Sequence, residues 1–234
     1  MAILRCIMSE PKRTDLHTHS LLSDGVLLPS ELLRRVAVLG FEAVAITDHA
    51  DASNMAYVIG SLRSLLHEQP HDFGVELLVG VELTHVGPRS IARLAREAKA
   101  LGAEIVVVHG ETIVEPVAPG TNRAAVESPE VDVLAHPGLL APEEARLAAA
   151  RGCAIEITTR KGHSLTNGHV ARVAREAGAL MVVNSDAHEP SDLAPLAFAQ
   201  KVASGAGLTE AEVFAATVTN PRALVSRVLA ARQR

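Results

Sequence analysis

The sequence predicts an α/β protein built on a parallel β-barrel that is closed or nearly closed. Seven short apolar segments alternate with helical segments along the 234 residues, and this alternation is typical of a parallel sheet covered by helices. No Gly-x-Gly-x-x-Gly motif follows the first strand, which argues against a dinucleotide-binding sheet. Most of the strands end in His, Asp or Glu, and the carboxyl ends of barrel strands meet at one rim.

The predicted strands are short runs rich in Val, Ile, Leu and Ala, bounded by turn residues. The first strand is more polar than the others and contains two histidines two residues apart. We predict the seven strands over residues 14–19, 43–47, 76–82, 104–108, 131–135, 154–158 and 180–183.

The intervening helices are predicted from apolar stripes at helical spacing. Residues 29–40 begin with proline and end with glycine, which are common at the start and the end of a helix. Residues 89–101 form an Ala-rich amphipathic segment that stops before Gly102. The other helices are predicted over residues 54–67, 142–151 and 167–177, with two more starting at Thr209 and Pro221.

Residues 111–129 show no strand or helix pattern and contain Pro116, Pro119 and Gly120. A structureless loop of this length is uncommon in a compact domain and is usually functional. We therefore expect this segment to be a lid or a wall of a site rather than a linker.

The composition limits the classes of protein. Hydrophobic residues make up 48% of the chain, with no Trp, one Tyr and four Phe, so the core must be aliphatic. The formal net charge is −5 without a block of like charges, and we expect no stable nucleic-acid partner, because backbone binding needs clustered Lys and Arg. Entry of a nucleotide or a single-stranded end into an active site stays open. The sequence contains no apolar run of membrane-spanning length, so we expect no membrane partner.

The chain shows no linker, repeat or low-complexity segment. We expect residues 1–13 to form an N-terminal extension and residues 14–234 a single barrel domain. The first residues are apolar, but charged residues from Glu10 onward follow too early for a signal peptide. Cys6 and Cys153 are too few for a disulfide framework, which favours a reducing, cytoplasmic location.

Nine side chains that suit metal coordination fall at or just after the predicted strand ends. They are His17, His19, Asp24, His49, Glu82, His109, His136, Asp186 and His188. A polar residue that merely ends a strand, without binding a metal, accounts for any one of these positions but not for all nine together. Imidazole and carboxylate ligands in combination suit Zn, Mn or Fe. Because nine ligands are too many for one ion, we expect more than one cation, with the Glu82 carboxylate as the natural bridge.

The motifs in this order resemble the PHP (polymerase and histidinol phosphatase) superfamily, and the resemblance is closest to its stand-alone, histidinol-phosphatase-like members. The matching motifs are DLHTH at residues 15–19, SDG at 23–25, TDH at 47–49, GVE at 80–82, HP at 136–137 and NSDAH at 184–188, together with His109. The resemblance covers nearly the whole predicted domain. It implies a distorted (β/α)7 TIM-like barrel, the PHP fold, with a trinuclear metal centre.

The resemblance also implies how the nine ligands are divided. One divalent cation would be held by His17, His19, Glu82 and Asp186. A second would be held by Glu82, His109 and His136, and a third by Asp24, His49 and His188. We expect Asp15 and Asp48, which lie beside ligand histidines, to orient imidazole rings.

Together, these expectations predict that the protein is a metal-dependent phosphoesterase that hydrolyses a small phosphate monoester resembling histidinol phosphate. Two cations about 3.5–4 Å apart lower the pKa of a bridging water, and the resulting hydroxide would attack phosphorus directly. We assign catalytic roles to Glu82, Asp186 and His188. Arginine and lysine suit phosphate binding, and the candidate substrate-binding residues are Arg160, Lys161, His163 and Arg123.

Two alternatives stay open. The first is an amidohydrolase-like or promiscuous hydrolase of phosphotriesters, esters or lactones. Such sites commonly use a bridging lysine at the end of the fourth strand, where this chain has His109. The second is a metal-bearing scaffold without catalysis, against which all nine ligand positions are filled.

Overall fold

The computed structural model describes residues 10–68 and 73–233. In these residues seven parallel strands are hydrogen-bonded in the order β1-β2-β4-β5-β6-β7-β8, and the two-residue strand β3 pairs with β4 outside this path. The strands are β1 (Arg13–Asp15), β2 (Phe41–Ile46), β3 (His49–Ala50), β4 (Glu76–Leu83), β5 (Ile105–His109), β6 (Val133–Ala135), β7 (Ala154–Thr158) and β8 (Met181–Asn184).

An isolated parallel bridge between Thr18 and Ala187 links the segments that follow β1 and β8. A backbone hydrogen bond from His19 N to Ala187 O, 2.8 Å long, lies beside it. The sheet is therefore a nearly closed parallel barrel, and the predicted fold class is confirmed.

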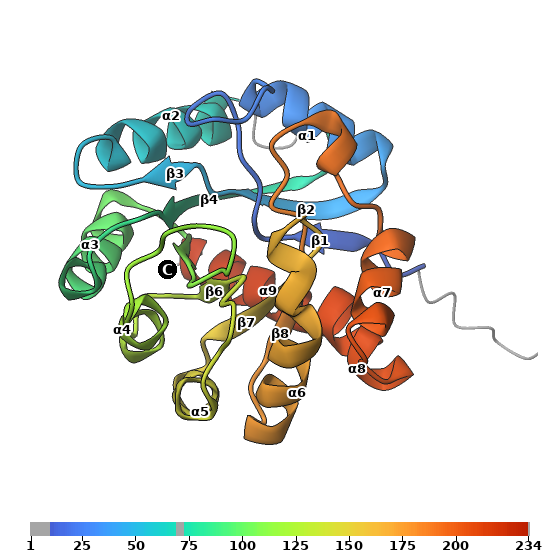
Figure 1. Cartoon of the computed structure of the whole chain (residues 1–234). Helices are drawn as coiled ribbons and strands as arrows, with labels where there is room; N and C mark the ends of the chain where they lie inside the picture. The colour runs from blue at the N-terminus through green and yellow to red at the C-terminus, as the bar shows by residue number, and fades with distance from the viewer. Residues whose placement is uncertain (1–9, 69–72, 234) are drawn as a thin grey trace, which may run out of the picture.

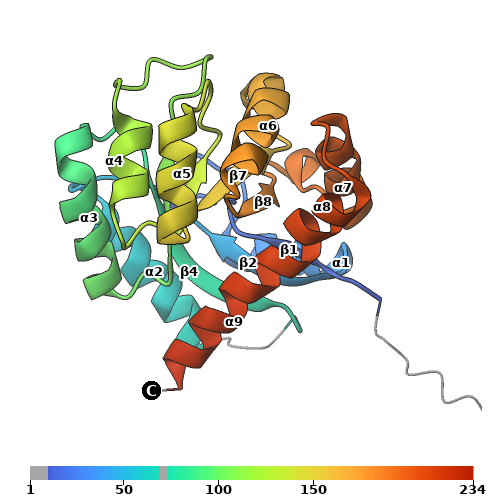
Figure 2. The same cartoon turned by 90° about the horizontal axis from the view of Figure 1, so that it is seen from below.

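Helices surround the barrel, as Figure 1 shows. They are α1 (Pro29–Val38), α2 (Met55–Glu68), α3 (Pro88–Leu101), α4 (Thr121–Glu127), α5 (Pro142–Arg151), α6 (Asn167–Ala177), α7 (Leu196–Gly205), α8 (Glu210–Phe214) and α9 (Asn220–Arg232). Helix α9 runs across one end of the barrel (Figure 2). The predicted helices are present at these positions, with ends that differ by a few residues.

The apolar side chains form two packed regions, because successive strand residues point to opposite faces. Val106 and Val108 of β5 pack outward against the helices, whereas Ile105 and Val107 point into the barrel. The interior set is small and aliphatic, and Leu224 and Val228 of α9 close it at the amino-terminal end of the strands. The interior beyond this plug, at the carboxyl end of the strands, is lined by polar residues.

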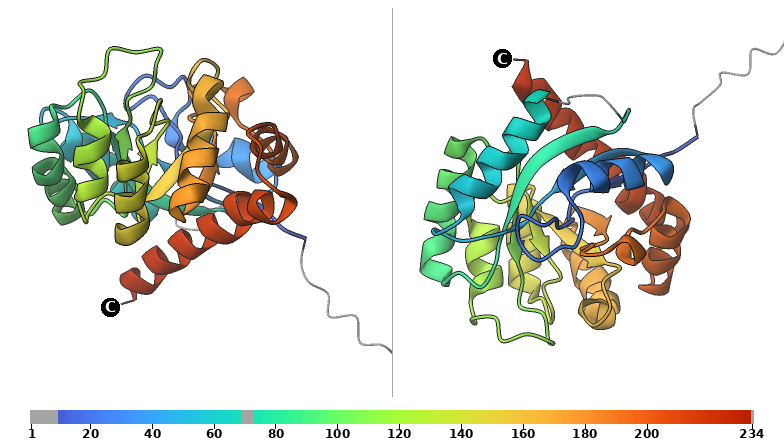
Figure 3. Two further views of the ribbon diagram at one scale, coloured as in Figure 1. Left: turned by 60° about the horizontal axis from the view of Figure 1, so that its bottom comes forward. Right: turned by 90° about the horizontal axis from the view of Figure 1, so that it is seen from above.

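One prediction needs correction. The segment 111–129 is not a continuous loop, because α4 occupies residues 121–127 after Gly120, whose φ is 89°. Seven residues are too short for a clear periodic signal, and the prolines and glycine before them concealed the helix. The irregular stretch before α4 covers residues 110–120, which stand beyond the ring of helices on the far side of the molecule from α9 (Figure 3, left), and a short irregular stretch follows α4.

Strand β1 begins at Arg13, one residue before the expected start of the barrel domain, and Arg13 is buried. Residues 1–9 of the expected extension lie outside the described residues. None of the helices within residues 10–68 and 73–233 has both the length and the apolar character that a membrane span needs.

Candidate metal centre

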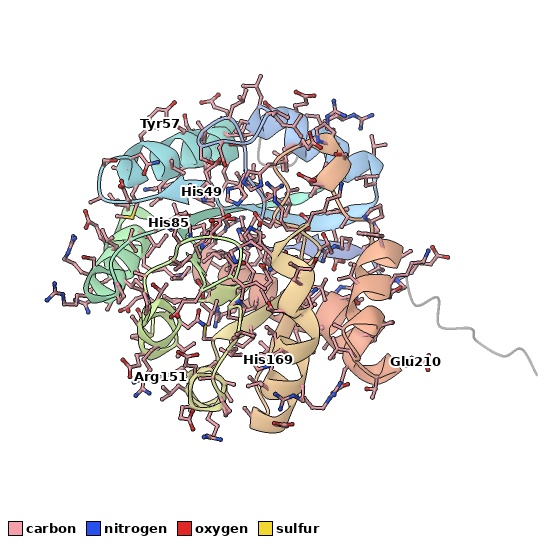
Figure 4. All side chains as sticks on the ribbon, viewed as in Figure 1. His49, Tyr57, His85, Arg151, His169 and Glu210 are labelled. Atoms are coloured by element: carbon pink, nitrogen blue, oxygen red, sulfur yellow. The ribbon has the colours of Figure 1, made fainter. Side chains whose placement is uncertain are left out.

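The strand ends bring all nine predicted ligands to one face of the barrel. On β4, Leu78 points into the barrel, and Glu82 lies four residues later on the same side. His109 ends β5 by the same alternation after Ile105 and Val107. Figure 4 shows His49 and His85 inside the ring of helices, whereas Tyr57, Arg151 and Glu210 lie at its periphery.

Glu82 is the centre of the cluster. Its Oε1 lies 3.3 Å from His17 Nε2 and 3.7 Å from His136 Nε2. Its Oε2 lies 2.7 Å from His49 Nδ1 and 3.7 Å from His19 Nε2. One fully buried carboxylate therefore contacts four imidazoles from the ends of three strands, β1, β2 and β6, which is the arrangement that a bridging ligand requires.

Asp24 joins the cluster through a tight loop. Its Oδ1 lies 3.2 Å from His188 Nε2 and 3.5 Å from His49 Nε2. A Cβ on Gly25 would lie 2.6 Å from the carbonyl carbon and oxygen of His19, so glycine is required for the loop to fold back. Donor atoms of Asp24, His49, His188 and His19 all lie within 4.8 Å of one another.

Asp186 faces the rings that follow β1. Its Oδ1 lies 3.1 Å from His19 Nε2 and 3.6 Å from His17 Nε2. Asp186 has a φ of 52° and His136 a φ of 24°. Positive φ at residues other than glycine is strained and tends to occur at functional sites. The backbone is thus held in an unfavourable conformation where these side chains turn toward the cluster.

The ring of His17 is oriented by a residue that we did not predict. Glu156 Oε2 lies 2.8 Å from His17 Nδ1, and Asn184 Nδ2 donates to the same oxygen at 2.9 Å. A carboxylate on one ring nitrogen directs the other nitrogen toward a metal. An isolated glutamate inside the apolar strand β7 is the sequence signal that could have revealed Glu156.

The expectation that Asp15 and Asp48 orient imidazoles is wrong for the described contacts. Asp15 accepts hydrogen bonds from Arg13 and from the backbone N–H groups of His17 and Ser185. Asp48 accepts from two serine hydroxyls and a backbone N–H in the loop after His19. Both carboxylates therefore fix the backbone conformation of the segments that carry the ligands, because their short side chains accept hydrogen bonds from nearby backbone N–H groups rather than from imidazole rings.

Unpartnered buried atoms test whether this set suits a metal. Within the described residues, seven buried side-chain nitrogen or oxygen atoms lack a hydrogen-bond partner, and six of them belong to the cluster and its support. These six are His17 Nε2, His19 Nδ1 and Nε2, Glu82 Oε1, His136 Nδ1 and Glu156 Oε1. Each such atom costs about 1–3 kcal/mol when it stays unsatisfied. The donors therefore fit divalent cations, which accept imidazole and carboxylate ligands together.

Burial and neighbouring charges shift the pKa values of the cluster. Burial, reinforced by neighbouring imidazoles, lowers the pKa of His19 and His136 well below the usual value, so both rings offer lone pairs. Burial raises the pKa of Asp186 to about 7. Burial on its own lowers the pKa of His49. Hydrogen bonds with the carboxylates of Asp24 and Glu82 outweigh burial and raise this pKa to about 10. A cation bound at these groups competes with protons.

A cleft of about 260 Å3 opens onto the cluster. Arg160 lines this cleft and a neighbouring pocket of about 360 Å3, which Lys161 also lines. Arg160 Nη1 lies 2.8 Å from Asp192 Oδ2. His163, another predicted substrate residue, also lines the cleft.

Arg123 lies elsewhere. It is an exposed residue of α4 that pairs with Glu127, and it lines neither of the two pockets. The structure therefore brings Arg160, Lys161 and His163 to the mouth of the cluster but not Arg123. Another residue that sequence reasoning missed, Glu115, lines the cleft from the segment before α4. Its position in a long loop between strand ends was the only signal.

Comparison with known proteins identifies relatives along nearly the whole chain. A profile of the PHP domain matches residues 15–115. An uncharacterized protein of Methanocaldococcus jannaschii is 48% identical over 217 residues, which span 92% of this chain and 100% of that protein. A probable phosphatase of Thermoanaerobacter sp. strain X514 is 30% identical over 218 residues, covering 84% of this chain and 87% of the relative. Ribonuclease P protein component 3 of Methanosarcina mazei is 28% identical over 235 residues, covering 94% and 91%.

Among solved structures, histidinol phosphate phosphatase of Lactococcus lactis, complexed with zinc, L-histidinol and phosphate, has a similar fold. The TM-score is 0.59 at 15% identity, and the alignment covers 85% of this chain and 95% of that one. This likeness supports the PHP-type barrel. Together with the sequence relatives, it shows that the chain belongs to the PHP domain family.

Proposed function

We propose that the protein is a metal-dependent phosphoesterase that hydrolyses a small phosphate monoester, with histidinol phosphate as the candidate from the family. The observation that carries the proposal is the convergence of buried imidazole and carboxylate donors beside Arg160 in one cleft. The probable phosphatase among the relatives and the phosphate-bound Lactococcus lactis enzyme support it. A cleft of about 260 Å3 suits a small molecule better than a polymer.

Three groups of donors would hold the cations, in the division that the family resemblance implies, and contacts within the groups support it. The groups are His17, His19, Glu82 and Asp186; then Glu82, His109 and His136; then Asp24, His49 and His188. Bound divalent cations in such a site activate a water molecule and clamp phosphate oxygens. Glu156 holds His17 in the orientation that leaves Nε2 facing the centre.

The protein groups at the mouth would bind the phosphate. Arg160 is held in place by Asp192, and its Nε lies 4.0 Å from Asp186 Oδ2. Its guanidinium can therefore contact a phosphate that rests against the cluster. Lys161 adds positive charge at the neighbouring pocket.

We assign catalytic roles to Glu82, Asp186 and His188. Asp186 and His188 line the cleft, and the two carboxylate oxygens of Glu82 face His17 and His49. A protein nucleophile is not required. Ser185 Oγ is buried and has no hydrogen-bond partner among the described residues, so it lacks a base that would activate it.

The test is a phosphate-release screen on purified, metal-loaded protein. The panel contains histidinol phosphate, nucleotides, an aryl phosphate, a phosphotriester and a lactone. We expect release from a monoester, and we expect His17→Ala and Glu82→Ala to abolish it while circular dichroism shows an intact fold. Turnover of only the triester or the lactone would favour an amidohydrolase-like enzyme, and metal binding without any turnover would favour a scaffold.

RNA is a second candidate partner, because the Methanosarcina mazei relative is a ribonuclease P component and aligns with 94% of this chain. The net charge of −5 opposes binding of a long polymer. A short single-stranded RNA therefore belongs in the same screen, where shortening from one end would identify a nuclease.

A further inference from the structure

The segment between β5 and α4 places one carboxylate over the cleft. Glu115 Oε2 lies 3.1 Å from Nε2 of both His109 and His85, and its Oε1 lies 3.3 Å from His163 Nε2. The three rings come from the end of β5, the turn after β4 and the short helix η1 (His163–Thr166). We propose that Glu115 and His163 are further ligands of the divalent cation that His109 binds, and that His85 positions Glu115. The inference rests on the proposed function only in that it uses the same metal centre.

The hydrogen bonding of His109 favours a cation at this point. His109 Nδ1 lies 3.2 Å from the backbone carbonyl oxygen of Gly110. A carbonyl can only accept, so Nδ1 carries the hydrogen and Nε2 of the neutral ring carries a lone pair. That lone pair faces Glu115 Oε2, which is also an acceptor, at 3.1 Å. A divalent cation bound by both atoms relieves the repulsion between them.

The distances agree with shared coordination. Zinc binds imidazole nitrogen and carboxylate oxygen at about 2.0–2.2 Å, and around a five-coordinate cation neighbouring ligand atoms lie about 3.0–3.6 Å apart. Glu115 Oε2 lies 3.1 Å from His109 Nε2, and Glu115 Oε1 lies 3.3 Å from His163 Nε2. Small shifts of a loop side chain are enough to complete such a site.

The hydrogen bond of His109 limits the number of cations that this ring can bind to one. Its Nδ1 is engaged by Gly110, so Nε2 can bind only one cation. Glu115 must therefore join that cation rather than create another. Donor atoms of His109, His136 and His163 lie within 4.8 Å of one another, and the His136 and His163 rings stack at 4.2 Å. The added ligands are thus expected to raise affinity without changing the stoichiometry.

His85 has the features of a positioning residue. Its backbone has a φ of 52°, which is strained for a residue other than glycine. The strained turn brings Nε2 within hydrogen-bond distance of Glu115 Oε2. By donating to this oxygen, His85 fixes the direction of the Glu115 carboxylate.

The proposal is tested by titrating chelator-treated protein with Co²⁺ in a calorimeter. We expect Glu115→Gln and His163→Gln to bind as many cations as the wild type, with one of them at least about tenfold weaker. The matched control is Glu127→Gln, an exposed carboxylate of α4 paired with Arg123, and it should leave the isotherm unchanged. We expect His85→Ala to weaken the same cation and His85→Gln to restore part of the affinity, since glutamine can donate a hydrogen bond.

Hydrogen exchange provides a second readout. Co²⁺ should protect residues 110–120 in the wild type and in Glu127→Gln, but less in Glu115→Gln, because the loop carries the ligand. Isotherms of Glu115→Gln and wild type that coincide would overturn the proposal. Weakened binding in a protein that releases no phosphate would leave this inference intact and remove the proposed function, so the two failures are distinguishable.

Discussion

The two ends of the barrel hold charged groups in opposite ways. At the end crossed by α9, Asp132 accepts from Lys99 Nζ at 2.6 Å, from Arg227 Nη2 at 2.5 Å and from the backbone N–H of Val106 at 2.8 Å. At the candidate metal centre, buried nitrogen and oxygen atoms face one another without hydrogen-bond partners within the described residues. Figure 2 shows the barrel from the side, with α9 across the first end at the bottom of the picture and the loop before α4 at the second end at the top.

This difference indicates that the α9 end contributes mainly to stability and the other end to function. Charges that are paired at the α9 end hold the helix against the barrel, and the pocket there, about 470 Å3, is larger than the cleft at the metal centre. A pocket of about 890 Å3 beside α7 and α8 is larger still, so pocket size alone would not select the candidate metal centre. The informative signals are the buried atoms that the protein itself does not satisfy and the positive φ angles of His136 and Asp186. Substitutions at the two ends should have separable effects.

The largest effect is expected for Glu82→Gln. The change keeps the shape of the side chain but removes the charge that four imidazoles share. Loss of several kcal/mol of transition-state stabilisation corresponds to a decrease of about a thousandfold or more in turnover. Steady-state phosphate release measures it, with bound metal determined in parallel. Turnover within a few-fold of the wild type would show that Glu82 does not bridge.

Removal of metal from the wild type should lower its thermal stability. At a free cation concentration about one hundred times the dissociation constant, one cation stabilises the fold by about 2.7 kcal/mol. For a chain of this size, this corresponds to a Tm shift of roughly 5–10 °C. Differential scanning calorimetry with and without chelator measures the shift. An equal shift in Glu82→Gln would contradict the assignment of the cations to this end.

Asp132→Asn should produce the opposite pattern. Asp132 is buried, and its loss leaves Lys99 and Arg227 without a partner carboxylate. Because both cationic side chains are partly exposed, we expect a loss of about 1–2 kcal/mol rather than the larger penalty of a fully buried pair. Urea unfolding measures the loss, while metal content and turnover stay at the wild-type level. The control is Glu176→Gln, an exposed partner of Arg172, with almost no expected effect.

The smallest effect concerns the thiol of Cys153, which lies just before β7 near the α9 end. Burial raises its pKa to about 12, so the thiolate is scarce at pH 8. In a Cys6→Ser background, we expect almost no reaction with a disulfide reagent in the native state and full reaction in urea. Fast labelling of native protein would show that this end opens more readily than its packing indicates.

The barrel, and the gathering of the nine candidate ligands at one rim, could be predicted because both depend on local signals. Apolar strands fix the alternation, and a residue that ends a strand is carried to the same rim as every other strand end. Glu156 and Glu115 could not be placed, since their roles depend on which distant ring each carboxylate meets. The α4 helix was missed because its seven residues carry little periodic signal.

The most direct measurement is anomalous X-ray scattering from crystals of the metal-loaded protein. We predict about three peaks per chain at the strand ends, one of them beside His17, His19 and Asp186 and another beside Asp24, His49 and His188. The absence of peaks there, or peaks only at the α9 end, would contradict a metal centre at this rim and the hydrolase built on it.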